Sequence, residues 1–200
     1  IQSGFRMSSH FAESWRETFL QTLRQDEFAR NLRDAALQER LGDWTKTLTA
    51  AVVASCQSLG WQAAAKGHRL AALPVPNSEY LNLDVMALAV NESRWRFPVA
   101  IFELENSPTD DRVAYSLWKV LCVRAEMRVV FCYRRDRNAG AVLTRRLSDE
   151  VINAFDISRR LDLEGETLLV IGSRDESATF PNNFFRWWML EHNTGSFRPF

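Results

Sequence analysis

The sequence has no hydrophobic run long enough to cross a membrane, and no signal-peptide pattern opens it. Its three cysteines show no CxxC spacing, which argues against a disulfide framework and favours a reducing compartment. Lysine plus arginine equal aspartate plus glutamate at 25 each, so no overall positive field favours nucleic-acid binding, although a local patch would suffice. These absences predict a soluble, cytoplasmic protein with no membrane partner.

Several common catalytic motifs are also missing. The sequence contains no Walker loop, GxGxxG, GxSxG or HExxH motif. His10, His68 and His192 do not have the spacing of metal ligands. The commoner nucleotide-binding and hydrolase classes are therefore excluded.

The length and composition indicate one compact domain. Two hundred residues, 46% of them hydrophobic, can bury a substantial core. Apolar residues recur at helical spacing over about 8–41, and Asp43 is placed to cap a further helix over 44–59. We therefore expect a helical N-terminal extension over 1–42 and a core domain over 43–200.

Two stretches have the pattern of neighbouring strands, LNLDVMALAV at 81–90 and FPVAIFELENS at 97–107. Because side chains alternate along a strand, Glu103 and Glu105 share an otherwise apolar face, and Asp84 lies on an apolar face of its own strand. A carboxylate in such a place is costly unless a positive charge meets it. If the strands form a hairpin, Asp84, Glu103 and Glu105 converge on an oxygen-rich cation site.

A helix and further strands follow this hairpin. Ser107 is expected to cap the helix, with Asp110 in its first turn. The apolar segment at 128–133 is expected to be a strand parallel to the Glu103 strand, because a helical crossover separates the two. A helix over 143–161 and a strand over 167–171 complete an α/β fold with a mixed sheet flanked by helices.

A short strand is also expected over 61–65, before the hairpin. The resulting order αβββαβ, with Asp84 on the second strand and Glu103-Leu104-Glu105 on the third, resembles the PD-(D/E)XK, or restriction-endonuclease-like, nuclease superfamily. The resemblance covers roughly 43–133. In that family an Asp and a following acidic residue hold Mg²⁺, and a Lys two positions further on helps to position the attacking water. The resemblance implies a restriction-endonuclease-like fold, Mg²⁺ or Mn²⁺ as cofactor, and nucleic acid, above all DNA, as partner. It also implies Asp84 and Glu103 as metal ligands. Because Mg²⁺ prefers oxygen ligands and keeps several waters, these two carboxylates and a backbone carbonyl, such as that of Leu104, would suffice.

The sequence departs from this pattern where the lysine is expected, because Glu105 stands there. Glu105 is interpreted as a general base or a metal-linked carboxylate. Alternatively, Lys119 on the following helix supplies the positive charge, as in family members whose lysine has moved to that helix. An acid on the first core helix sometimes completes the family's site, and Glu39 and Asp43 are the candidates.

Phosphodiester cleavage needs a hard cation to neutralise charge on the phosphate and to lower the pKa of a bound water. The leading hypothesis is therefore a Mg²⁺-dependent endonuclease. An inactive nuclease-like domain that binds nucleic acid or protein is the alternative. A third hypothesis is a scaffold that dimerises through an exposed stripe of Trp15 and Phe19, and a homodimer remains open in every case.

Two softer signals are compatible with nucleic acid. Several arginines, among them Arg134, Arg146 and Arg160, are potential phosphate contacts, and Trp187 and Trp188 are potential stacking platforms. Scattered arginines on a neutral chain favour a solvated surface, and adjacent tryptophans favour a core or interface role.

Overall fold

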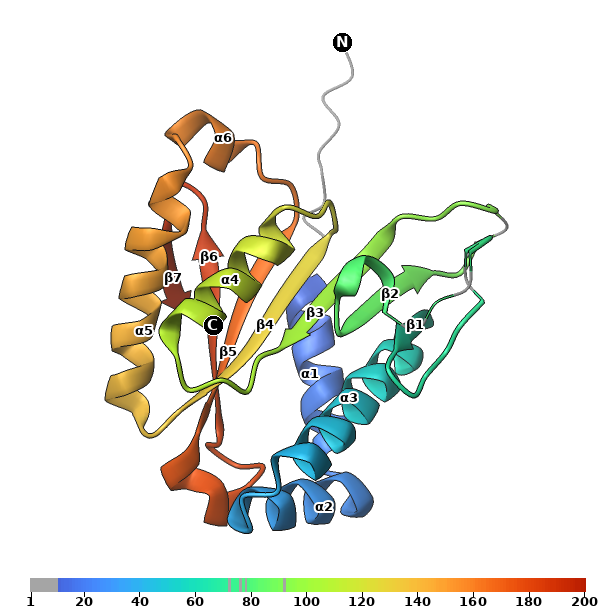
Figure 1. Cartoon of the computed structure of the whole chain (residues 1–200), viewed down its shortest axis with the longest axis vertical. Coiled ribbons are helices and arrows are strands. Elements are labelled where there is room, and N and C mark those ends of the chain that lie inside the picture. Colours follow the sequence, from blue (N-terminus) through green and yellow to red (C-terminus); the bar gives the residue numbers. More distant parts are fainter. Residues whose placement is uncertain (1–10, 72, 76, 78, 92) are drawn as a thin grey trace.

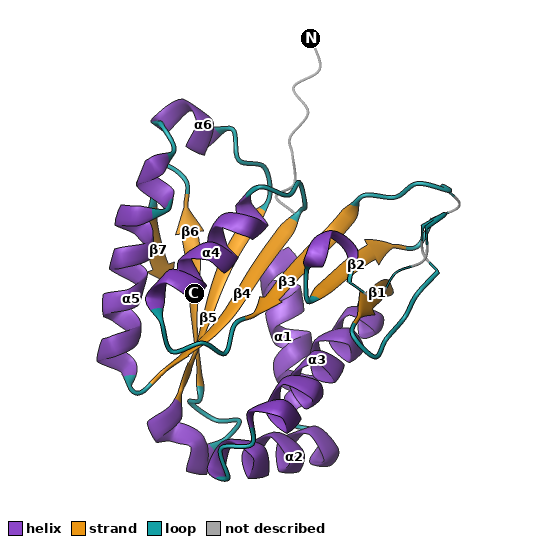
Figure 2. Ribbon diagram, in the orientation of Figure 1, coloured by secondary structure: helices purple, strands orange, loops and turns teal. Residues whose placement is uncertain are grey.

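The computed structural model describes residues 11–71, 73–75, 77, 79–91 and 93–200. One seven-stranded mixed sheet lies between helices on both of its faces (Figure 1; Figure 2). The expected α/β class, with a mixed sheet flanked by helices and a helical N-terminal part, is confirmed. Across these residues, no helix has both the length and the apolar character needed to cross a membrane.

The strands follow one another across the sheet in chain order. They are β1 (Trp61–Ala65), β2 (Val85–Ala89), β3 (Pro98–Leu104), β4 (Met127–Arg134), β5 (Glu166–Ser173), β6 (Phe185–Glu191) and β7 (Ser196–Pro199). The α-helices are α1 (Phe11–Leu23), α2 (Asp26–Leu37), α3 (Leu41–Ser58), α4 (Asp110–Leu121), α5 (Arg137–Glu150) and α6 (Ile157–Leu161). Short 3₁₀ turns occupy Tyr80–Asn82, Ile152–Ala154 and Arg174–Thr179.

The strand directions follow from the connections. β1, β2 and β3 form an antiparallel meander, and β4 then joins β3 in parallel after the crossover helix α4. β5 lies parallel to β4 after α5 and α6, whereas β6 and β7 return antiparallel. The predicted hairpin, crossover and fourth strand are confirmed. The helix expected over 143–161 is instead two helices, because the chain turns between α5 and α6.

Alternation along the strands divides the core into two apolar layers. Phe102 of β3 packs in the layer that contains α1 and α3, and Ile101 packs in the layer that contains α4 and α5. Figure 1 shows α4 and α5 on the viewer's side of the sheet and α1 behind it. Glu103, two residues after Ile101, therefore faces α4.

Helix α1 contributes its aromatic face to the layer beneath the sheet. Trp15 and Phe19 are both 0% exposed, and Trp15 packs with its ring centroid 5.0 Å from that of Phe102. The hypothesis of an exposed Trp15 and Phe19 stripe for dimerisation is therefore wrong, because the sheet of the same chain covers both side chains.

Both predicted helix caps are wrong by a few residues. α3 begins at Leu41, so Asp43 lies in its first turn and pairs with Arg40 at 2.6 Å. α4 begins at Asp110 after Thr109, and the Ser107 hydroxyl accepts a hydrogen bond from the N–H of Thr109 at 3.2 Å. A serine before a helix can either cap the helix or stabilise a local turn, and the sequence pattern is the same in both cases.

Candidate functional site

Asp84 and Glu103 lie opposite each other on the hairpin of β2 and β3. The register pairs Val85 with Phe102, so Asp84, directly before β2, faces Glu103. The Asp84 Oδ2 atom accepts a hydrogen bond from the backbone N–H of Leu104 at 2.7 Å. This bond holds the Asp84 carboxylate against β3, on the face of the sheet that α4 covers.

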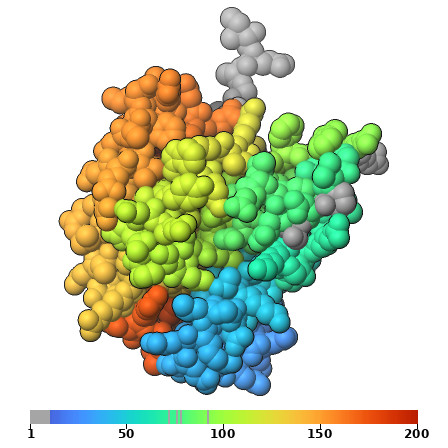
Figure 3. Space-filling view, viewed as in Figure 1, coloured from blue at the N-terminus to red at the C-terminus, as the bar shows by residue number. Residues whose placement is uncertain are grey.

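Helix α4 brings a lysine to the same pair. The Lys119 Nζ atom lies 2.7 Å from Oε2 of Glu103 and donates a hydrogen bond to the carbonyl of Asn82 at 2.9 Å. The Lys119 side chain is 18% exposed and that of Glu103 is 6% exposed, so the ion pair is largely removed from water. Figure 3 shows the surface of α4, in yellow-green, directly beside the green segment that contains β2 and β3. The structure thus brings together Asp84, Glu103 and Lys119.

The Glu103 carboxyl group is electrostatically unusual. Burial raises its pKa from 4.5 to about 7, and the negative charge of Asp84 adds to this rise. The hydrogen bond and the charge of Lys119 oppose the rise without cancelling it. A pKa displaced toward neutrality by burial and a charge partner is typical of functional sites.

The Glu103 Oε1 atom is buried and has no hydrogen-bond partner among the described residues. A buried oxygen in this state costs free energy unless a donor or a cation meets it. Two facing carboxylates with one unsatisfied oxygen have the ligand chemistry that Mg²⁺ and Mn²⁺ prefer. Within the described residues, no group of three or more His, Cys, Asp or Glu side chains could hold a metal ion. The pair therefore fits a cation that takes one or two protein carboxylates and keeps several waters, as Mg²⁺ commonly does.

Glu105 follows the end of β3 and has its own partners. Its Oε1 accepts a hydrogen bond from the N–H of Ser107 at 2.7 Å, and its Oε2 accepts one from the Ser116 hydroxyl at 3.4 Å. Glu105 thus shares the α4 face with Glu103 but is bound to the turn and to α4. The expected convergence of all three carboxylates on one cation is not formed, because these hydrogen bonds hold Glu105 outside the pair.

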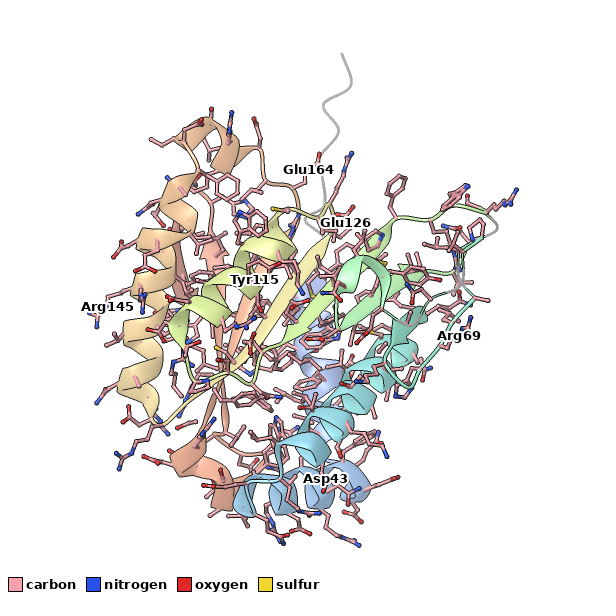
Figure 4. All side chains as sticks on the ribbon, in the orientation of Figure 1. Asp43, Arg69, Tyr115, Glu126, Arg145 and Glu164 are labelled. Carbon is pink, nitrogen blue, oxygen red and sulfur yellow. The ribbon has the colours of Figure 1, made fainter. Side chains whose placement is uncertain are left out.

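The two candidate acids of the first core helix lie elsewhere. Glu39 occupies the turn between α2 and α3 with φ of 54°, and Asp43 is paired with Arg40. Figure 4 shows Asp43 at the end of the molecule formed by α2 and α3. Because α3 covers the opposite face of the sheet from α4, neither acid joins the Asp84 and Glu103 pair.

The backbone before Asp84 is a feature that sequence reasoning missed. Leu81 and Asn82 both adopt left-handed conformations, with φ of 54° and 55°. Two consecutive non-glycine residues in this region are strained, and such strain persists only where the surroundings impose it. Here the turn directs the Asn82 carbonyl to Lys119, so it positions the lysine as well as Asp84. The sequence indicates this left-handed turn only weakly, because of the two residues only Asn82 is of a type that commonly adopts the conformation.

Three of the arginines considered as phosphate contacts have partners within the chain, and Trp187 lies in the core. Arg146 pairs with Asp110 and Asp111 at 2.9 Å each, and Arg134 also binds Asp110. Arg160 is buried and donates to the carbonyl of His192 at 2.8 Å. Trp187 is buried in the core, so the core role is confirmed for that tryptophan.

The sequence matches no protein-family model and no curated protein, and the fold matches no solved structure. The kinship with restriction-endonuclease-like nucleases therefore stays a prediction from the motif.

Proposed function

We propose that the chain is a metal-dependent nuclease with a restriction-endonuclease-like core, which hydrolyses phosphodiester bonds, with DNA as the substrate. One observation carries the proposal: Lys119 contacts Glu103 at 2.7 Å on the same sheet face where Asp84 lies opposite Glu103. An acidic pair with an adjacent lysine is the chemical set that the family motif requires. Here the lysine comes from α4, and the strand position two residues after Glu103 carries Glu105. The order of α3, β1, β2, β3, α4 and β4 is compatible with the family's αβββαβ core.

Each residue has a distinct role in the proposed site. Asp84 and Glu103 would hold the cation, with the carbonyl of Leu104 as a further oxygen ligand. A bound Mg²⁺ supplies charge neutralisation at the phosphate and lowers the pKa of a water. The Lys119 ammonium favours the ionised form of Glu103 and stabilises negative charge that develops on the scissile phosphate. Glu105, anchored by Ser107 and Ser116, holds the turn from β3 toward α4.

Cleavage assays test the proposal directly. The whole chain is incubated with single- and double-stranded DNA and with RNA, in Mg²⁺ or Mn²⁺ and in a chelator. We expect metal-dependent cleavage that Glu103→Gln and Lys119→Met each lower by about 100-fold or more. Glu126→Gln is the matched control, because Glu126 is exposed (Figure 4) and lies just before the start of β4, whereas Glu103 lies near the end of the parallel strand β3. Equal cleavage by wild type and Glu103→Gln would refute the assignment.

Thermal melting with Mn²⁺ separates catalysis from binding. A ligand that binds only the folded chain raises Tm by mass action. We expect a Mn²⁺-dependent rise in wild type and in Glu126→Gln but not in Glu103→Gln. A rise in wild type without cleavage of any substrate would favour the alternative, an inactive nuclease-like binding module.

A further inference from the structure

A pocket lies away from the Asp84 and Glu103 pair and shares no residue with it. Its volume is about 830 Å³, within the range of small-molecule sites. Helix α1, the first turns of α5 and the start of β6 form its walls. Four of its lining residues are arginines: Arg16, Arg24, Arg137 and Arg186.

Positive charge is concentrated in this pocket on a chain whose net charge is zero. Asp136 is the acid in the lining, and its Oδ1 accepts a hydrogen bond from the N–H of Ala139 at the start of α5. Arg137 is paired with Glu176 at 3.2 Å. Among the described residues, Arg16, Arg24 and Arg186 form no ion pair with a carboxylate, so three of the four arginines that line the pocket have no anionic partner.

Arg186 gives the most specific indication of a ligand. Its Nε–H is buried and has no hydrogen-bond partner among the residues that the structure describes. A buried donor of this kind costs free energy until an acceptor meets it. A guanidinium group matches the geometry of a phosphate, which accepts two parallel N–H bonds.

The pocket also has aromatic residues in its lining. Arg16 lies over the rings of Trp187 and Phe200, with its Cζ atom 5.8 and 5.0 Å from the two ring centroids. Trp187 is buried, and Arg16 covers both rings, so neither ring is the surface offered to a ligand. Trp188 is half-buried and lines the pocket with Ile171, and Asn182 adds a polar amide. A tryptophan ring and a planar guanidinium group are both side chains that stack on aromatic bases.

We propose that this pocket binds a nucleoside 5′-phosphate, with the phosphate on the arginines and the base against Trp188. The ligand is either a free nucleotide or the 5′-terminal nucleotide of a strand, because both offer the same group. The inference does not depend on the proposed nuclease activity, since the pocket does not use Asp84, Glu103 or Lys119.

Calorimetric titration of the whole chain with AMP tests this inference. We expect binding that is at least about tenfold tighter than that of adenosine or of inorganic phosphate, because each lacks half of the contacts. Arg186→Gln should weaken AMP binding by about 10- to 100-fold, and Arg186→Lys should restore only part of it, because lysine lacks the planar fork. Arg24→Gln, at an exposed position, gives a second test should Arg186→Gln fail to fold.

Arg145→Gln is the matched control, because Arg145 is exposed on α5 and points away from the molecule (Figure 4). Glu103→Gln should bind AMP as wild type does, so that this result is independent of the nuclease assay. A 5′-phosphorylated oligonucleotide that binds more tightly than AMP identifies a strand end as the ligand, and tighter AMP binding identifies the free nucleotide. No heat of binding with AMP or the oligonucleotide at about millimolar concentration, or unchanged AMP binding in folded Arg186→Gln and Arg24→Gln, would overturn the proposal.

Discussion

The Lys119 Nζ atom lies 2.7 Å from the Glu103 carboxylate, which also faces Asp84 across the hairpin. One lysine side chain, Lys119, therefore lies beside a pair of acidic side chains. Because Glu103 is buried, its ionisation depends on Lys119, on Asp84 and on any cation that joins the pair. Stability and metal binding should thus both depend on pH through Glu103.

The first prediction concerns pH and stability. The pKa of Glu103 is about 7 in the folded chain and near 4.5 when unfolded, so the folded state binds more protons between these values. Its contribution to stability is complete below about pH 4.5 and is lost as the pH rises through about 7. Relative to Glu103→Gln, wild type should lose up to about 3 kcal/mol between about pH 4 and pH 8, by urea unfolding. A constant difference across this range would show that the Glu103 pKa is not raised.

The second prediction concerns Lys119→Met. Removal of the lysine leaves Glu103 buried beside Asp84 without its cation, so the pKa of Glu103 should rise further. Breaking a buried pair in this way costs about 3–5 kcal/mol when the remaining group is charged. The loss should therefore be larger at about pH 8 than at about pH 5, where Glu103 is protonated. The double variant Lys119→Met with Glu103→Gln should recover most of it, and an equal loss at both pH values would contradict the argument.

The third prediction concerns Asp84→Asn. The amide oxygen still accepts a hydrogen bond from the Leu104 N–H, so the hairpin should remain intact. The negative charge is lost, and the pKa of Glu103 should fall because Asp84 raises it. Carbon-13 NMR of labelled glutamate carboxyl groups measures this pKa directly. Asp84→Asn and Lys119→Met should move it in opposite directions, and movement in the same direction would show that the two groups do not flank Glu103 as described.

The fourth prediction concerns the role of α1 in the core. Trp15 is fully buried and contacts the rings of Phe19 and Phe102, both at 5.0 Å between centroids. Trp15→Ala should therefore cost about 3–5 kcal/mol of stability in a denaturant titration. Trp118→Ala is the control, because Trp118 is 53% exposed on α4, and its loss should be within about 1 kcal/mol. A small effect of Trp15→Ala would mean that α1 is not part of the folding unit.

Local patterns in the sequence predicted the hairpin, the crossover and the face of each carboxylate, because the alternation of a strand and the apolar period of a helix are local properties. The predicted starts of α3 and α4 were wrong. Asp43 and Ser107 are residue types that often cap helices, but here Asp43 forms an ion pair with Arg40 and Ser107 stabilises a turn. The left-handed turn at Leu81 and Asn82 was missed because its carbonyl partner, Lys119, is distant in the chain. The arginine-lined pocket escaped prediction for the same reason, because α1, α5 and β6 supply its arginines separately.

The last prediction tests whether a lysine at position 105 can replace Lys119 as the positive charge beside Asp84 and Glu103. Glu105 lies two residues after Glu103 on the same face of the sheet, where the family motif places its lysine. In the Lys119→Met background, Glu105→Lys should therefore restore a positive charge beside Glu103.

Cleavage by this double variant should exceed that of Lys119→Met alone by about tenfold or more, and the pKa of Glu103 should move back down. Glu105→Gln in the same background is the control, because it removes the Glu105 charge without supplying a cation. A folded double variant as inactive as Lys119→Met would mean that the α4 position supplies geometry that the strand position lacks. Full rescue would mean that the positive charge itself, from either element, is what the Asp84 and Glu103 pair requires.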